Sequence, residues 1–281
     1  MGEIMNRTVK QKSYNLIPYL VLIILAVVFV FPILVMFNTS LKTGSEAFSA
    51  NPSFFPKHFY IENYKNVFAT IPFFRYFYNT MYVSVFNVLG TLIVTPMIAY
   101  SLSKLKWWGH NIIFSIVLAT MLIPYTATMI PLYKIWANLN LVGTFAPLII
   151  PAFFGHPFYI VLLRQFMLSI PDELLEAAKI DGCSSFGRFT KIVLPLSKPG
   201  LATITIFSFM FTYSDFLGPL LYANNTDHYT LSIGLQSFMN EHSVDWTSLM
   251  AAATLFIIPI IAIFLFAQKY FIEGISTTGL K

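Results

Sequence analysis

Six stretches of the chain are apolar for about twenty residues each, which is the length that crosses a hydrocarbon core of roughly 30 Å. A hydrocarbon core offers no water to backbone groups, so a spanning stretch must satisfy them internally as a helix. Charged residues make up 10% of the chain, against about 25% in soluble domains. The sequence predicts an all-α, polytopic membrane protein with six transmembrane helices, at residues 17–37, 78–102, 112–130, 145–163, 201–221 and 249–271.

The distribution of Lys and Arg predicts the orientation of these spans. Basic residues are concentrated in the N-terminal segment, the second and fourth loops and the C-terminal tail. Because cytoplasmic segments carry the excess of positive charge, both termini and the long fourth loop, residues 165–200, are predicted to be cytoplasmic. The same rule explains the net charge of +5 without nucleic acid. The first apolar run lacks a cleavage signal and is expected to remain as a helix.

The fourth loop is charged and has the pattern of a helix at its start. Ser169 can cap a helix that has Pro171 in its first turn and Asp172 in position to return the capping bond. Leu174, Ala177 and Ala178 would then share a small apolar face. Gly182 is placed to end this helix in a left-handed conformation.

A second short helix is predicted after Gly182. Ser184 or Ser185 can cap it. Pro195 is expected to end it, because proline lacks the N–H that a helix interior needs. Its apolar residues share one face: Phe186, Phe189, Ile192 and Val193.

Two membrane helices can be joined by a few residues, and this loop is far longer. One interpretation is a preformed docking element that presents charges and small residues to a partner. The alternative, a cap over the chain's own helices, stays open at this point.

The loop resembles the "EAA" loop of permease subunits of ATP-binding-cassette (ABC) importers. The resemblance is carried by Glu176-Ala177-Ala178, Asp181-Gly182 and Leu194-Pro195-Leu196. It implies a type I importer transmembrane fold, with residues 1–281 as a single transmembrane domain. It also implies a coupling helix that docks a cytoplasmic ATPase, through Glu173, Glu176, Ala177, Ala178, Asp181, Gly182, Phe186, Phe189, Leu194 and Pro195.

Further segments look like the carbohydrate branch of this family, in which the second permease has six helices. They are SLKTGSEAF, ENYKNVF, SDFLGPLL and FIEGISTTGLK. The resemblance implies these partners: a second homologous permease, a dimer of ABC ATPase subunits, an extracytoplasmic solute-binding protein, a carbohydrate substrate and the lipid membrane, without nucleic acid. It implies no cofactor in this chain, with ATP and Mg bound by the ATPase. The expected location is the cytoplasmic membrane of a bacterium or archaeon.

Four polar residues are candidates for the substrate path: Asn87, Tyr213, Ser214 and Asp215. An acid within a membrane span is expensive, so Asp215 is read first as functional. The alternative is an Asp near the interface that is bonded to a helix end. The fourth apolar run contains Pro147, Pro151, Gly155 and Pro157, so it is expected to be kinked or partly unwound.

The fifth loop has no Lys or Arg, and the resemblance implies that it reaches toward the binding protein. The candidate contacts are Asn240, Glu241, His242 and Ser243. An ordinary exposed loop is the alternative.

Catalysis by this chain is not expected. The only glycine spacing of the phosphate-binding kind, Gly182 to Gly187, continues with Arg188-Phe189 and lacks the Lys and Ser/Thr that hold phosphate and magnesium. The histidines form no H-E-x-x-H, and a single cysteine makes no zinc knuckle. Three alternatives to a sugar importer are a sugar-phosphate importer for a compound such as glycerol 3-phosphate, an ion-coupled secondary transporter that uses Asp215, and a non-transporting scaffold.

Overall fold

The structure is a computed structural model that describes residues 2–51, 53–239 and 244–278. Within these residues the fold is helical, and the only strand-like pairing is a single bridge between Met239 and Val244. The chain divides into two compact units. One comprises Met1–Ile71 with Ser237–Ile257, and the other comprises Pro72–Gln236 with Ile258–Lys281.

The first unit is built around the C-terminal end of a long apolar helix. Helix α1 (Gly2–Ser40) is followed by α2 (Gly44–Ala47) and α3 (Glu62–Thr70), and α15 (Trp246–Thr278) begins in this unit. Buried Asn63 on α3 donates hydrogen bonds to the backbone oxygens of Ser40 at 2.8 Å and Lys42 at 2.7 Å. The Ser40 carbonyl is one that the end of α1 leaves without a helical partner, and the Lys42 carbonyl lies in the segment that follows α1.

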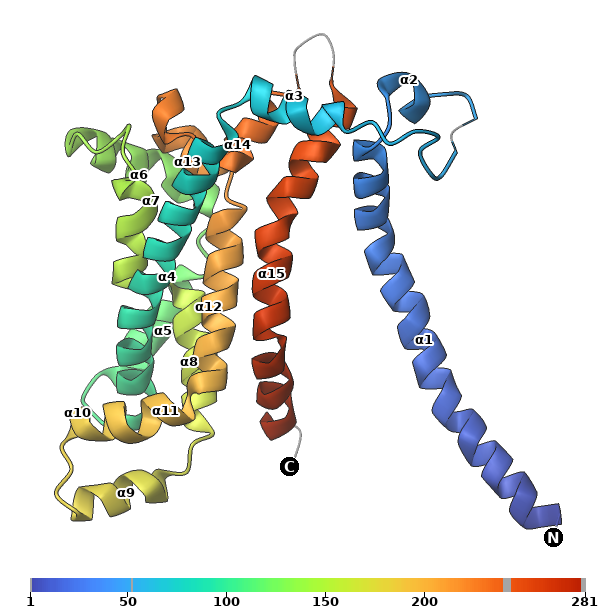
Figure 1. The fold of residues 1–281 in the computed structure, drawn as a ribbon. Coiled ribbons are helices and arrows are strands. Elements are labelled where there is room, and N and C mark those ends of the chain that lie inside the picture. Colours follow the sequence, from blue (N-terminus) through green and yellow to red (C-terminus); the bar gives the residue numbers. More distant parts are fainter. Residues whose placement is uncertain (1, 52, 240–243, 279–281) are drawn as a thin grey trace. The chain divides into compact units, whose positions relative to one another are not determined.

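The second unit has three helices at its centre: α4 (Phe73–Lys104), α8 (Pro157–Leu168) and α12 (Lys198–Tyr213), which pack against one another (Figure 1). Small residues such as Gly90, Thr91 and Ala99 form the buried side of α4. They let neighbouring helices approach closely, as is usual between helices in membranes. Thr91 and Ser208 bridge α4 and α12, with their hydroxyl oxygens 3.2 Å apart.

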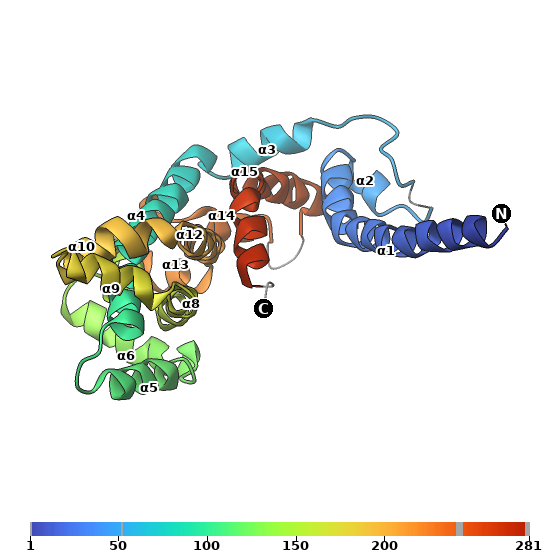
Figure 2. The ribbon, with the colours of Figure 1, turned by 90° about the horizontal axis from the view of Figure 1, so that it is seen from below.

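The other elements of the second unit are short. They are α5 (His110–Thr120), α6 (Tyr125–Asn138), α7 (Ala146–Ile149), the 3₁₀ helix η1 (Ile150–Phe154), α9 (Asp172–Ile180), α10 (Ser185–Arg188), the π-helical η2 (Phe189–Val193), α11 (Leu194–Leu196), α13 (Leu217–Tyr222), the 3₁₀ helix η3 (Thr226–His228) and α14 (Leu231–Gln236). Seen from below, α9 and α10 lie near the ends of α4, α8 and α12 (Figure 2).

Four segments of the described residues are long and apolar enough to cross a membrane. They are Leu16–Ser40, Phe73–Lys104, Ala146–Leu168 and Trp246–Phe266. Two bent helix pairs also qualify if each is counted as one span: α5 with α6, and the Ser185–Leu196 segment with α12. Four of the six predicted spans therefore correspond to long helical segments, and the other two lie in bent pairs.

The third and fifth spans were predicted as continuous helices, and this prediction was wrong. The third breaks between Thr120 and Tyr125, where α5 and α6 meet at 99°. Pro124 stands at this break and cannot donate a helical hydrogen bond. The fifth span ends at Tyr213, and residues 217–222 form the separate helix α13. In the third span the apolar composition continues through the break, so hydrophobicity alone does not reveal it. The break that follows α12 falls at the polar residues Ser214 and Asp215.

The predicted interruption of the fourth span is confirmed. Three residues, Pro147, Pro151 and Gly155, fall at transitions through α7 and η1 into α8, and Gly155 has a φ of 85°. Freed backbone groups at membrane depth need protein or water partners. Asn87 on α4 supplies one by donating to the Leu148 oxygen at 3.0 Å.

Candidate functional site

Residues 165–200 contain the two predicted helices and the predicted glycine elbow. Helix α9 ends at Ile180, and Gly182 follows with a φ of 80°, which is a left-handed conformation. The N–H groups of Gly182 and Cys183 donate to the oxygens of Lys179 and Ala178, closing the end of α9. The Ser184 hydroxyl accepts a bond from the Gly187 N–H at 3.1 Å, so the predicted cap of the second helix is confirmed.

Two predictions about the helix ends in this loop were wrong. Ser169 does not cap α9, because its hydroxyl donates to the Phe166 oxygen at the end of α8. Pro195 does not end the second helix, which continues through η2 and α11 to Leu196. A π-helical turn just before Pro195 changes the hydrogen-bonding register there, since the Leu194 N–H donates to the Phe189 oxygen five residues back.

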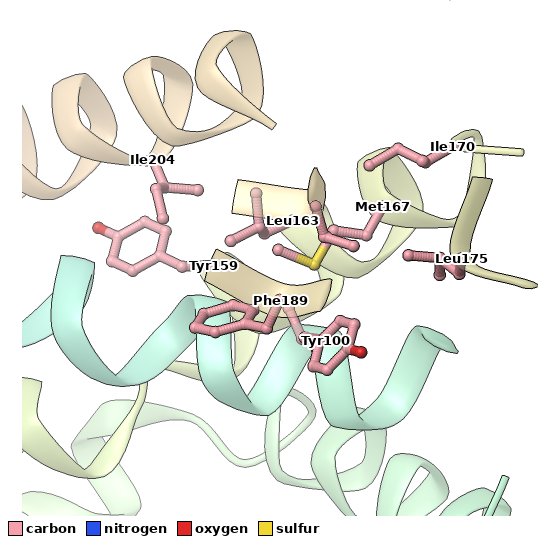
Figure 3. Packing of buried hydrophobic residues seen from close by; sticks show 10 residues of the cluster. Tyr100, Tyr159, Leu163, Met167, Ile170, Leu175, Phe189 and Ile204 are labelled. Carbon is pink, nitrogen blue, oxygen red and sulfur yellow. The ribbon is translucent and has the colours of Figure 1, made fainter. Parts of the chain in front are cut away.

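One side of the loop is packed into a hydrophobic core. Leu175 of α9 and Phe189 and Val193 of η2 join Tyr100, Leu163 and other buried residues of α4, α8 and α12 (Figure 3). The rings of Tyr100 and Phe189 have their centroids 5.2 Å apart. The loop is therefore fixed to the helix bundle from within.

A side-chain contact also joins the two loop helices. Arg188 Nη1 of α10 reaches the Leu175 oxygen of α9 at 3.5 Å, while Nη2 of the same guanidinium donates to the Ser185 hydroxyl within α10 at 3.0 Å. The left-handed turn at Gly182 and the guanidinium together hold α9 and α10 as one layer.

The opposite side of the loop is exposed. We call this side the loop surface. It carries apolar side chains and carboxylates together: Leu174, Ala177, Ile180, Phe186, Glu173, Glu176 and Asp181. Ile180 is 86% exposed and Phe186 is 67% exposed. Large apolar side chains this exposed, within a charged rim, are typical of a protein contact site.

The structure distributes the predicted docking residues between the two sides of the loop. Seven are exposed, namely Glu173, Glu176, Ala177, Asp181, Gly182, Phe186 and Pro195. Ala178 and Leu194 are half-buried, and Phe189 lies in the core at 7% exposure. The surface position of Phe189 was therefore wrong. Sequence reasoning also missed Ile180, whose signal was an apolar side chain beside Asp181 and Gly182.

Two of the candidate path residues, Asn87 and Ser214, have hydrogen bonds to other residues of the chain. Asn87 donates to the Leu148 oxygen, the Ser208 hydroxyl donates to Asn87, and the Ser214 hydroxyl donates to the Met210 oxygen. Tyr213 is fully buried. The Ser208 bond joins α12 to α4, whereas the Leu148 and Met210 bonds lie at the interruption of the fourth span and at the end of α12.

Asp215 lies beyond the end of α12, where its carboxylate accepts the Gly218 N–H at 3.1 Å. Burial raises the pKa of the Asp215 carboxyl, and bonds from the backbone N–H groups of Gly218 and Leu217 offset part of that rise. The Asp215 carbonyl oxygen accepts the Ser232 hydroxyl at 2.6 Å. This geometry matches the alternative of an Asp bonded to a helix end.

The candidate contacts to a binding protein, Asn240, Glu241, His242 and Ser243, lie outside the described residues. Among the residues that are described, no group of three or more His, Cys, Asp or Glu side chains is arranged to hold a metal ion.

Several known proteins are similar to this chain over nearly its whole length. The permease AraQ of an arabinooligosaccharide transport system in Bacillus subtilis is 34% identical over 95% of this chain and 96% of the relative. GanQ of a galactooligosaccharide system in the same organism is 32% identical, with 95% of both chains covered. UgpE of an sn-glycerol-3-phosphate system in Brucella abortus is 29% identical over 94% of this chain and 96% of the relative.

A solved structure has the same fold. A chain of a bacterial ABC transporter involved in the import of the acidic polysaccharide alginate superposes with a TM-score of 0.78 and is 26% identical. The match covers 92% of this chain and 97% of that one.

The fold, the anchored loop and these relatives define a multi-pass membrane permease of an ABC import system. Residues 92–277 match the binding-protein-dependent transport system inner membrane component family, and the chain belongs to it. The resemblance seen in the loop sequence is thereby confirmed. A permease of this kind implies a second permease, an ATPase and a binding protein in general.

Proposed function

We propose that this chain forms one of two membrane halves of an ATP-driven importer of sugars or oligosaccharides. The loop surface docks a cytoplasmic ATPase subunit, and both chain termini lie on the same side as the loop. ATP and Mg are bound by the ATPase, so the chain itself is not catalytic and needs no cofactor. A solute-binding protein delivers the substrate from the opposite side.

One observation supports the docking role most directly. The loop surface exposes Ile180 and Phe186 on a layer whose other side is packed into the helix bundle. Interface anchors are typically aromatic or apolar side chains that fill a pocket on the partner. A rigid base under them allows movement of the partner to reach the membrane helices.

The docking proposal is tested by Phe186→Asp in a chain co-expressed with its candidate ATPase and partner permease. We expect the ATPase affinity to fall about 30-fold, since removal of an interface anchor costs about 2 kcal/mol or more. Co-purification and titration of the ATPase measure this change.

Phe48→Asp is the matched control for Phe186→Asp. Phe48 is 65% exposed, nearly the same as Phe186, but follows α2 in the other unit. Equal ATPase retention by both variants, with both folded, would contradict the docking role.

The sugar class is proposed from the relatives. AraQ and GanQ belong to oligosaccharide systems. The segments SLKTGSEAF, ENYKNVF, SDFLGPLL and FIEGISTTGLK of this chain resemble the carbohydrate branch. The competing substrate is a sugar phosphate, because UgpE belongs to a glycerol-3-phosphate system. Uptake of arabinotriose, galactobiose and sn-glycerol 3-phosphate by the reconstituted complex separates the two, and import of glycerol phosphate alone would replace the oligosaccharide proposal.

An ion-coupled transporter that uses Asp215 is tested by Asp215→Asn. Asn retains the oxygen that accepts the Gly218 N–H, so we expect ATP-dependent uptake to persist. Because the pKa of the Asp215 carboxyl is raised in the folded chain, this group contributes stability below the ordinary carboxyl pKa. That contribution is lost as the pH rises through the folded pKa. The neutral Asn side chain should therefore not lower the melting temperature at pH 7. Loss of uptake with intact ATPase binding would favour the ion-coupled mechanism.

A further inference from the structure

The last turn of α4 is hydrogen-bonded to both helical parts of the loop, although α4 is not adjacent to the loop in sequence. The Lys104 ammonium donates to the Ile170 oxygen at 2.5 Å and to Asp172 Oδ1 at 2.7 Å, where α9 begins. The Tyr100 hydroxyl donates to the Ser185 oxygen at 3.2 Å, where α10 begins. We call Lys104 and Tyr100 the α4 linkage.

The Lys104 side chain is only 3% exposed, whereas the Asp172 side chain is 71% exposed. A buried ammonium needs hydrogen-bond acceptors to offset its lost hydration. The carboxylate of Asp172 remains in water, so its attraction is screened and contributes little. The carbonyl of buried Ile170 is therefore the acceptor that holds Lys104 in place.

Ile170 lies in the turn that connects α8 to α9. The loop is covalently joined to α8 at this turn and to α12 at Ser197. A movement of the loop would be transmitted to α8 and α12 through these covalent connections of the backbone alone. Helix α4 has no such covalent connection, and its contacts with the loop include the α4 linkage and the shared core.

We propose that Lys104 is a positioning residue that makes α4 move together with the loop when the ATPase moves. The proposal rests on the proposed function of the loop surface as the ATPase dock. Helix α4 packs against both α8 and α12, so all three central helices would then shift as one group. Without the linkage, only the shared core would join the loop to α4, and much of the ATP-driven movement of the loop would be lost as sliding along the end of α4.

The test compares Lys104→Met with Lys106→Met in the full complex reconstituted in lipid vesicles. Both variants remove one positive charge, but Lys106 is exposed. The readout is uptake per ATP hydrolysed, with arabinotriose or whichever compound of the panel above the wild-type complex imports. We expect Lys104→Met to retain the ATPase while uptake per ATP falls about tenfold, since a charge-assisted bond is lost.

Two further variants identify which bond matters. Lys104→Arg keeps a donor in reach of the Ile170 oxygen and should restore most of the uptake per ATP. Asp172→Asn removes only the charge of the exposed partner and should lower uptake per ATP by about twofold or less. If Lys104→Met does not accumulate, Tyr100→Phe keeps the ring in the core and should lower uptake per ATP about threefold.

Several results would overturn the proposal. One is an unchanged uptake per ATP in Lys104→Met, and another is an equal fall in Lys106→Met. Where Tyr100→Phe is the variant used, an unchanged uptake per ATP in that variant has the same meaning. Loss of ATPase binding by Lys104→Met would also overturn it, because Lys104 would then only maintain the shape of the dock. Failure of the docking proposal is recognised separately, by ATPase retention in Phe186→Asp.

Discussion

A Gly155→Val chain is expected to unfold far more easily than the wild type, with a loss of about 3–5 kcal/mol. Two effects add at this position. Gly155 has a φ of 85°, where a β-branched residue is strained. A Cβ atom would also lie 2.9 Å from Cδ1 of Ile98 on α4 and 3.1 Å from Cδ1 of Ile160. The melting temperature of the purified chain in detergent measures the combined effect.

Gly182→Val separates the two effects at Gly155. Gly182 has nearly the same left-handed φ, 80°, but has no atom within 4 Å of an added Cβ. We expect it to lose about 2 kcal/mol through backbone strain alone. Equal losses of unfolding free energy in the two variants would contradict a contribution of close packing between the broken helix and α4 to the effect of Gly155→Val.

Phe189→Ala is expected to weaken ATPase binding even though Phe189 does not reach the loop surface. Phe189 lies on η2, and its side chain is buried against Tyr100 of α4. Truncation of a buried Phe costs about 3–5 kcal/mol. The cavity would loosen the loop from the bundle, so the docking residues would lose their fixed arrangement. Hydrogen exchange should show faster exchange in residues 172–196, and ATPase titration should show the loss of affinity.

Phe186→Ala is the comparison for Phe189→Ala. Because Phe186 is largely exposed, its truncation should weaken ATPase binding without faster exchange in the loop. Unchanged exchange in Phe189→Ala would contradict the view that the core supports the dock.

Local sequence signals predicted the parts of the fold that depend on local chemistry. Gly182, Ser184 and the prolines of the fourth span act through the conformation of their own backbone or a neighbouring bond, and the structure confirms each of them. Long apolar runs likewise predicted the helices α1, α4 and α15.

Other features depend on partners that are distant in sequence. The burial of Leu175 instead of Leu174 follows from the core under α9, which no pattern within α9 specifies. In the sequence, Lys104 is only one of the basic residues of the second loop that predict orientation, because its acceptors lie 66 and 68 residues away. The bend between α5 and α6 was missed since apolar residues continue through it.

The continuous passage of the second loop helix through Pro195 gives that helix a mechanical property. Residues 185–196 form one rod that meets α12 at 76°. A rigid helix fixed at such an angle acts as a lever arm on α12, to which it is joined. A sideways push on the rod would be converted into rotation and tilt of α12, with little displacement along its axis. The uninterrupted run from Ser185 to Leu196, which includes the π-helical turn, sets the length of that arm.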